Sequence, residues 1–286
     1  MQRMISSHLI CNHRLTTAWL NRVESADIAA VEFFCAKQHF DYANKAQIAE
    51  LGHFFRDSQL KLHSLHSPMY TDEVWGKSGP QTHINITERD KAKRIQWIDE
   101  VKRALEVAET ISFRYLIQHL GVSGQEYSDY AIEAAFSSLE ELVLFARQRG
   151  VEILLENIPN DLSTAERLEY FNGVTHLKMN YVFDTGHAHI GKGIAGEFET
   201  MQARIRSLHV HDNDGKDDQH LLPMAEGSSG SIDWAATMEL LRSRPGQYPL
   251  LLELRDDPAL NYSLDHVLRA FDQLESTTPQ RSETNA

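Results

Sequence analysis

The chain has 286 residues and a formal net charge of -13, with 42% hydrophobic and 24% charged residues. This composition is that of an ordinary globular protein with one large or two smaller domains, and the acidic balance argues against a general electrostatic grip on nucleic acid. No apolar run approaches the roughly 20 residues that span a bilayer, and residues 1–14 lack the pattern of a signal peptide. We therefore expect a cytoplasmic protein without a membrane partner.

Short apolar runs typical of strands alternate with longer amphipathic segments along nearly the whole chain. The predicted strands cover residues 4–10, 29–34, 60–66, 113–119, 151–157, 181–187, 205–212 and 249–255. The predicted helices cover residues 16–25, 45–58, 88–110, 129–149, 163–171, 198–204, 233–242 and 263–275. Eight strand-helix units without a Gly/Ser-rich linker predict a single α/β domain, a (β/α)8 TIM barrel over residues 1–276. The polar residues 277–286 are predicted to form a disordered tail.

Histidines and carboxylates gather at the ends of the last six predicted strands. They are His66, His119, Glu156, Asp184, His187, His209, His211 and Glu253. In a barrel of parallel strands these ends meet at one face, where the active sites of this fold are built. A lone buried carboxylate costs several kcal/mol of desolvation. A cation shared by these side chains removes that cost, so it explains why six consecutive strands end in such residues better than a separate reason for each strand. For any single histidine the alternative is a hydrogen-bonded core residue.

The densest group of such residues is the stretch SLHVHDNDGKDDQH at 207–220. His209 and His211 alternate across Val210, so both imidazoles leave a strand on one face, and Asp218 and His220 form a second pair after a polar turn. Imidazole nitrogen and carboxylate oxygen are ligands of zinc, manganese and iron. Taken alone, this stretch equally fits a solvated acidic loop.

Two histidines on earlier strands have separate interpretations. His8, near the end of the first predicted strand, is expected to line the floor of the site. His63 alternates with its neighbours on the third predicted strand and is expected to face the helix layer.

Taken in order, the motifs of the chain resemble those of the xylose isomerase-like TIM barrels. This superfamily includes sugar and sugar-phosphate isomerases and epimerases, and the endonuclease IV type of AP endonuclease. The motifs are SLHSP, QHLG, LLENIP, FDTGH, LHVHDN, DQH, AEGSSGSIDW and LELR. Each motif is short, but their order and their assignment to strands are specific for the superfamily, and the resemblance covers most of the chain.

The isomerase and epimerase branch holds one divalent metal with four side chains. The resemblance maps these ligands to Glu156, Asp184, His209 and Glu253. It implies an isomerase or epimerase of a sugar, sugar phosphate or related polyol ketone, working through a metal-stabilised enediolate with Mn, Zn or Co. Glu156 and Glu253 would remove and return the proton, or act as ligands alone. Candidate substrate contacts are His66, His119, His187, His211 and Arg255. His211 is also the alternative to His209 as a ligand, and a homodimer is compatible with this function.

The endonuclease branch holds three zinc ions with nine side chains, and each has a counterpart here. They are His66, His119, Glu156, Asp184, His187, His209, Asp218, His220 and Glu253. A multinuclear zinc site implies phosphodiester cleavage as the alternative function. Against a DNA partner, acid matches or exceeds base in the loops after the second, third and seventh predicted strands. A barrel that binds metal and sugar without turnover is the third hypothesis. Between one and three ions are therefore expected, and their number separates the first two functions.

Overall fold

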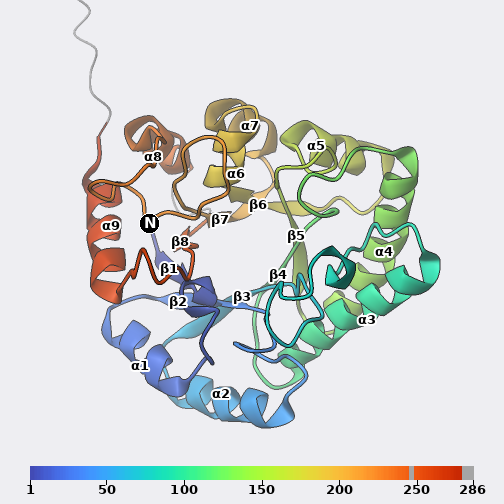
Figure 1. The fold of residues 1–286 in the computed structure, drawn as a ribbon, viewed down its shortest axis with the longest axis horizontal. Coiled ribbons are helices and arrows are strands. Elements are labelled where there is room, and N and C mark those ends of the chain that lie inside the picture. Colours follow the sequence, from blue (N-terminus) through green and yellow to red (C-terminus); the bar gives the residue numbers. More distant parts are fainter. Residues whose placement is uncertain (245–247, 279–286) are drawn as a thin grey trace, which may run out of the picture.

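The computed structural model describes residues 1–244 and 248–278. Its strands are β1 Arg3–Ser6, β2 Ala30–Phe34, β3 Lys61–His66, β4 Tyr115–Gln118, β5 Glu152–Glu156, β6 Asn180–Asp184, β7 Ile205–His209 and β8 Leu250–Leu252. Successive strands pair in parallel from β1 to β7, and β8 pairs in parallel with β1. Val210 closes the ring, because its N–H donates to Leu251 at 2.9 Å and its carbonyl accepts from Glu253 at 3.2 Å. The predicted (β/α)8 barrel is confirmed (Figure 1).

The helices form an outer ring around the strands (Figure 1). They are α1 Thr17–Ser25, α2 Lys45–Asp57, α3 Lys91–Glu106, α4 Asp129–Arg147, α5 Ala165–Val174, α6 Thr185–Ile190, α7 Ile194–Met201, α8 Trp234–Arg242 and α9 Leu264–Ser276. Side chains such as those of Asn44, Asp90 and Ser128 cap the first turns of their helices. Among the helices within the described ranges, none has the length and hydropathy needed to cross a membrane. Most of the predicted disordered tail, residues 279–286, lies outside the described residues.

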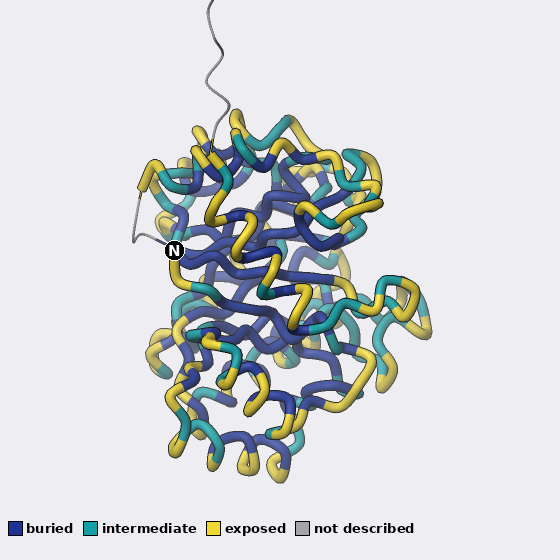
Figure 2. Tube along the Cα trace, turned by 90° about the vertical axis from the view of Figure 1, so that its left-hand side faces the viewer, coloured by how far each residue is buried: buried dark blue, intermediate teal, exposed yellow. Residues whose placement is uncertain are grey.

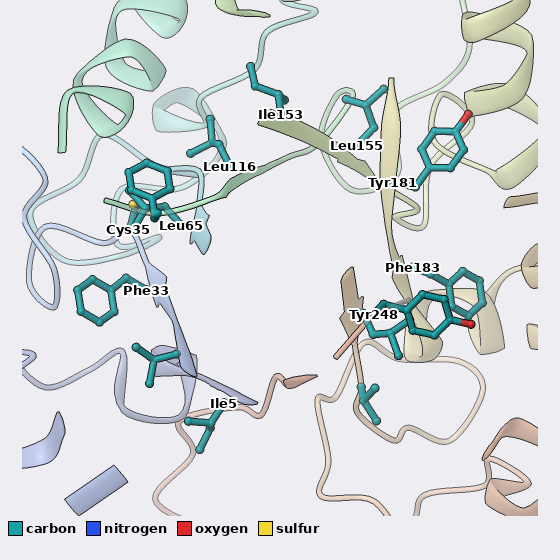
Figure 3. Close-up of a cluster of buried hydrophobic side chains, with 14 of the residues drawn as sticks. Ile5, Phe33, Cys35, Leu65, Leu116, Ile153, Leu155, Tyr181, Phe183 and Tyr248 are labelled. Carbon is teal, nitrogen blue, oxygen red and sulfur yellow. The ribbon is translucent and has the colours of Figure 1, made fainter. Parts of the chain in front are cut away.

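The main hydrophobic core lies between the strands and the helix ring. Figure 3 shows Leu116, Ile153, Leu155 and Tyr181 on the outer sides of their strands, and these residues belong to the core cluster that the helices cover. The burial colours agree, since the strands are buried and the exposed residues lie on the helices and loops (Figure 2). The alternate residues of each strand must therefore point into the barrel.

The inward positions change from apolar to acidic toward the carboxyl ends of the strands. Leu154 of β5 belongs to a small cluster inside the barrel, and Glu156 follows it on the same face two residues later. The same spacing joins Leu251 of β8 to Glu253, and Asp184 ends β6 on its inner face. The alternation of side chains along each strand thus places these carboxylates inside one end of the barrel.

His63 faces the barrel interior, so its predicted orientation toward the helix layer is wrong. The β2–β3 pairing shifts by one residue, since Leu62 pairs with Val31 whereas Ser64 pairs with Glu32. His63 is the extra residue of this bulge, which breaks the alternation on which the prediction relied. Its Nε2 lies 3.2 Å from the Ser207 hydroxyl of β7, across the barrel.

Candidate metal centre

Three groups of histidines and carboxylates lie at the carboxyl ends of the strands. The central group consists of Glu156, Asp184, His209 and Glu253, whose ligand atoms all lie within 4.8 Å of one another. All four side chains are buried. His209 Nδ1 lies 2.9 Å from Glu156 Oε1 and 3.1 Å from Glu253 Oε2. One imidazole nitrogen facing several carboxylate oxygens is a donor set that suits a divalent cation.

The second group joins two histidines to one glutamate of the central group. His119, just after β4, places Nε2 3.0 Å from Glu156 Oε2. His66, the last residue of β3, places Nε2 3.6 Å from the same oxygen. The two carboxylate oxygens of Glu156 therefore face different groups, an arrangement that suits a bridging ligand.

The third group is built from α6 and the loop after β7. It consists of His187, His211, Asp218 and His220. Asp218 lies between two rings, 3.2 Å from His187 Nε2 and 3.3 Å from His220 Nε2. The rings of His211 and His220 stack with their centroids 3.8 Å apart.

The nine side chains predicted as ligands from the sequence thus come together in these three groups. His211 lies with the third group, and its Nε2 also lies 3.0 Å from Asp184 Oδ1 of the central group. Its role as the alternative to His209 stays a prediction. His187 was predicted to lie on the sixth strand and instead lies on helix α6. Asp184 explains this difference, because its Oδ1 accepts a hydrogen bond of 2.7 Å from His187 N and begins the helix.

Opposite charges stabilise this cluster. Burial raises the pKa of the Glu156 carboxyl, but the His209 and His119 rings outweigh burial and hold that pKa well below its ordinary value. Burial disfavours the charged form of His220 too, which lowers its pKa. The Asp218 carboxylate more than offsets this effect and raises the pKa of His220 to about 9. Without metal, the carboxylates therefore raise the pKa of His187, His209 and His220, whereas burial lowers the pKa of His119. A divalent ion would take the place of the protons that the raised pKa values favour.

A small cavity of about 90 Å³ opens onto the second and third groups. One wall is apolar and includes Phe34, Met69 and Trp75, while Arg255 is exposed beside it. His8 lines this cavity, as the sequence predicted, with Nδ1 3.9 Å from a carboxylate oxygen of Glu253. A larger hollow of about 620 Å³ lies elsewhere, and its described lining residues include neither a histidine nor a carboxylate. The cavity therefore has histidines and carboxylates on one side and apolar side chains on the other.

Asp212 fixes the loop that carries the third group. Its carboxylate accepts hydrogen bonds from Ser231 N at 3.0 Å, Ile232 N at 3.1 Å and Trp234 Nε1 at 2.7 Å. The SSGSIDW segment is thereby tied to the end of β7. This assigns a structural role to an aspartate that stands between two ligand-type histidines in the sequence.

Glu32 of β2 is the buried site residue that sequence reasoning missed. It is 0% exposed, and its Oε2 lies 3.1 Å from His209 Nε2. The available signal was a single glutamate inside the apolar run AVEFF. Such an inward carboxylate needs a partner, as the glutamate in LLLELR does.

Replacing Gly186 by alanine is expected to disorder the third group. A Cβ atom at this position would lie 2.0 Å from Cε1 of His211, so the ring must move and its stack with His220 must break. We expect a stability loss of about 1–3 kcal/mol in urea unfolding, with weaker zinc binding. Gly196→Ala is the matched control, because no atom of the part of the chain that the structure describes lies within 4 Å of its Cβ position, apart from its own helix and its chain neighbours. Unchanged stability and zinc affinity in Gly186→Ala would contradict this packing.

Comparison with known proteins identifies the family. The sequence profile described as "Xylose isomerase-like TIM barrel" matches residues 20–274. The chain belongs to this family. The resemblance that the motifs predicted is therefore confirmed.

Two relatives come from Methanocaldococcus jannaschii. Uncharacterized protein MJ1311 is 28% identical over 174 residues, which are 57% of this chain and 58% of that protein. Uncharacterized protein MJ1614 is 30% identical over 148 residues, which are 50% of this chain and 57% of that protein. The chain thus spans less than three fifths of the length of these two relatives.

Three solved structures share the fold. A D-tagatose 3-epimerase-like protein superposes with a TM-score of 0.73 at 23% identity, over 96% of both chains. The 3-keto-D-glucoside 4-epimerase YcjR from E. coli gives 0.69 at 14% identity, over 96% of this chain and 99% of that one. The IolI protein with a bound zinc atom gives 0.74 at 16% identity, over 96% of both chains.

Proposed function

We propose that this protein is a divalent-metal-dependent isomerase or epimerase of a sugar, sugar phosphate or related polyol ketone. The observation that carries the proposal is the central group, in which one imidazole and three carboxylates bring ligand atoms within 4.8 Å of one another. Four buried groups of this kind suit Mn, Zn or Co. A bound ion would supply positive charge beside a carbonyl and its neighbouring hydroxyl, where negative charge develops as a proton leaves carbon.

Glu156 and Glu253 are the proposed acid/base pair. Both line the cavity, and they reach it from β5 and from the end of β8. Two carboxylates from separate strands allow one to remove the proton and the other to return it. Glu253 is the stronger candidate for removal, because Glu156 is engaged by His119 at 3.0 Å and His209 at 2.9 Å, whereas Glu253 is engaged at such a distance by His209 alone, at 3.1 Å. The role of Asp184 is then that of a ligand.

The cavity itself supports a small substrate. His66, His119 and His187 line it and offer ring nitrogens to hydroxyl or phosphate oxygens, and the apolar wall suits the carbon face of a sugar. Arg255 is the only lysine or arginine among the described lining residues. One cation suffices to orient an anionic group on a sugar, whereas a nucleic-acid backbone is gripped by several.

Two measurements on the purified protein test this function. Metal analysis is expected to find near one Mn, Co or Zn per chain. The protein is then incubated in D2O with ketoses, aldoses and their phosphates. NMR is expected to show that the substrate C–H proton exchanges for deuterium from the solvent. Metal and sugar binding without exchange would instead identify a passive binder. Asp184→Asn should abolish exchange, while Glu226→Gln, at an exposed loop position, should preserve it.

Phosphodiester hydrolysis with a multinuclear zinc site is the second candidate. It is favoured by the second and third groups, which add six side chains to the central four. A cluster of three ions suits in-line attack on a phosphodiester, since one ion activates water while others hold phosphoryl oxygens. Near three Zn per chain, together with cleavage of an abasic DNA duplex and no proton exchange, would replace the first function by this one.

A further inference from the structure

Glu32 is an acidic residue on the inner face of β2, paired in register with Ser6 of β1 and Ser64 of β3. Its neighbours Val31 and Phe33 point outward into the core beneath the helices, so Glu32 points into the barrel. It is completely buried, and its Oε1 has no hydrogen-bond partner among the described residues. Burying a carboxylate in this way costs free energy of desolvation unless a charged partner lies beside it.

The partner of Glu32 is the ring of His209. Glu32 Oε2 lies 3.1 Å from His209 Nε2 and accepts a 2.7 Å hydrogen bond from the Ser64 hydroxyl of β3. The opposite ring nitrogen, His209 Nδ1, faces Glu156 and Glu253. The two nitrogens of one imidazole thus face two different carboxylate environments, one on each side of the ring.

The carboxylates on the two sides of the His209 ring determine which of its nitrogens can bind a cation. A neutral imidazole carries one N–H, and the nitrogen without hydrogen is the metal ligand. A carboxylate at Nε2 accepts that hydrogen, so the Nδ1 lone pair is left toward the central group. An acceptor behind a ligating histidine also fixes the ring orientation and strengthens the ligand.

We propose that Glu32 is a positioning residue that holds His209 with Nδ1 toward a divalent ion in the central group. Ser64 in turn holds the Glu32 carboxylate from the neighbouring strand. This inference rests on the metal-dependent function proposed above. It adds a buried carboxylate of β2 to a metal centre whose ligand-type residues in the three groups lie on β3 to β8 or in the segments that follow these strands. Glu32 does not itself contact the ion.

The test compares metal affinity in the full chain of wild type and Glu32→Gln. Glutamine keeps the size of the side chain but removes its charge. Competition with a chromophoric chelator is expected to show that Glu32→Gln binds Zn2+ about 10- to 100-fold more weakly. Ser207→Ala, which changes another buried side chain in the barrel that contacts His63 rather than Glu32, is expected to bind Zn2+ as wild type does. Equal affinity in wild type and Glu32→Gln overturns the inference and leaves the proposed function standing.

A second measurement needs no variant. In Zn2+-loaded wild type, 15N NMR of the imidazoles is expected to place the His209 proton on Nε2 and the metal on Nδ1. The reverse assignment overturns the inference even if Glu32→Gln fails to fold. A wild-type protein that binds none of Zn2+, Mn2+ and Co2+ overturns the proposed function and this inference with it, so the two failures are distinguishable.

Discussion

Glu253→Gln is expected to lower kcat about 10²- to 10⁴-fold, the range that a positioned acid or base contributes. The side chain follows β8, is 2% exposed, and places Oε2 3.1 Å from His209 Nδ1. Glutamine fills the same space but takes up no proton, so the step at carbon loses its base. The measurement is the rate of proton exchange with solvent for the substrate found in the D2O screen, at saturating substrate and metal.

The metal content of the same variant separates two roles of Glu253. A protein that keeps its ion and loses exchange identifies the glutamate as the base. A protein that loses both identifies it as a ligand whose charge the ion needs. Glu226→Gln is the control for the substitution itself, because that residue is exposed on a loop and away from the cavity. Full exchange in Glu253→Gln would show that the proton is moved by another group.

The barrel could be predicted because its signals are local. Alternation within a strand and the recurrence of strand-helix units are readable over short stretches of sequence. The residues at which strands end are harder to predict, because single side chains determine them. The first predicted strand ran to residue 10, but Ser6 ends it by accepting a 3.3 Å hydrogen bond from His8 N, after which the chain forms a 3-10 turn, Ser7–Ile10.

The candidate site could be predicted only where polar residues end apolar runs. Glu156 and Glu253 stood out for that reason, and the structure brings them together with His209. Glu32 lies in the middle of its apolar run, and its partner His209 is 177 residues away in the sequence. Such a pairing depends on the closure of the whole barrel, and the bulge that turns His63 inward depends on strand register. Neither can be read from a local pattern.

Removal of the metal is expected to destabilise the protein, and more so at high pH. Binding only to the folded state adds about 2.7 kcal/mol at a free ion concentration of roughly 100 Kd, or about 5 °C in Tm for a chain of this size. In the metal-free protein the pKa of His220 is raised from 6.5 to about 9 by Asp218, against the effect of burial. That contribution is fully present below pH 6.5 and is lost as the pH rises through about 9. An ion held by the third group replaces this proton, so the gain in Tm on adding Mn2+ should grow between these two values where that group is loaded.

Thermal unfolding with a chelator or with excess Mn2+, at several pH values from 6.5 to 9, measures this dependence. His220→Gln is expected to flatten the decline of the metal-free Tm with pH, because the group that loses its proton is gone. His176→Gln is the matched control, since that side chain is 67% exposed and lies at Glu140 on the surface. At low pH protons compete with the ion for the same nitrogens, so the gain must shrink there. A gain that is constant or that falls as the pH rises would show that metal and proton do not share these ligands.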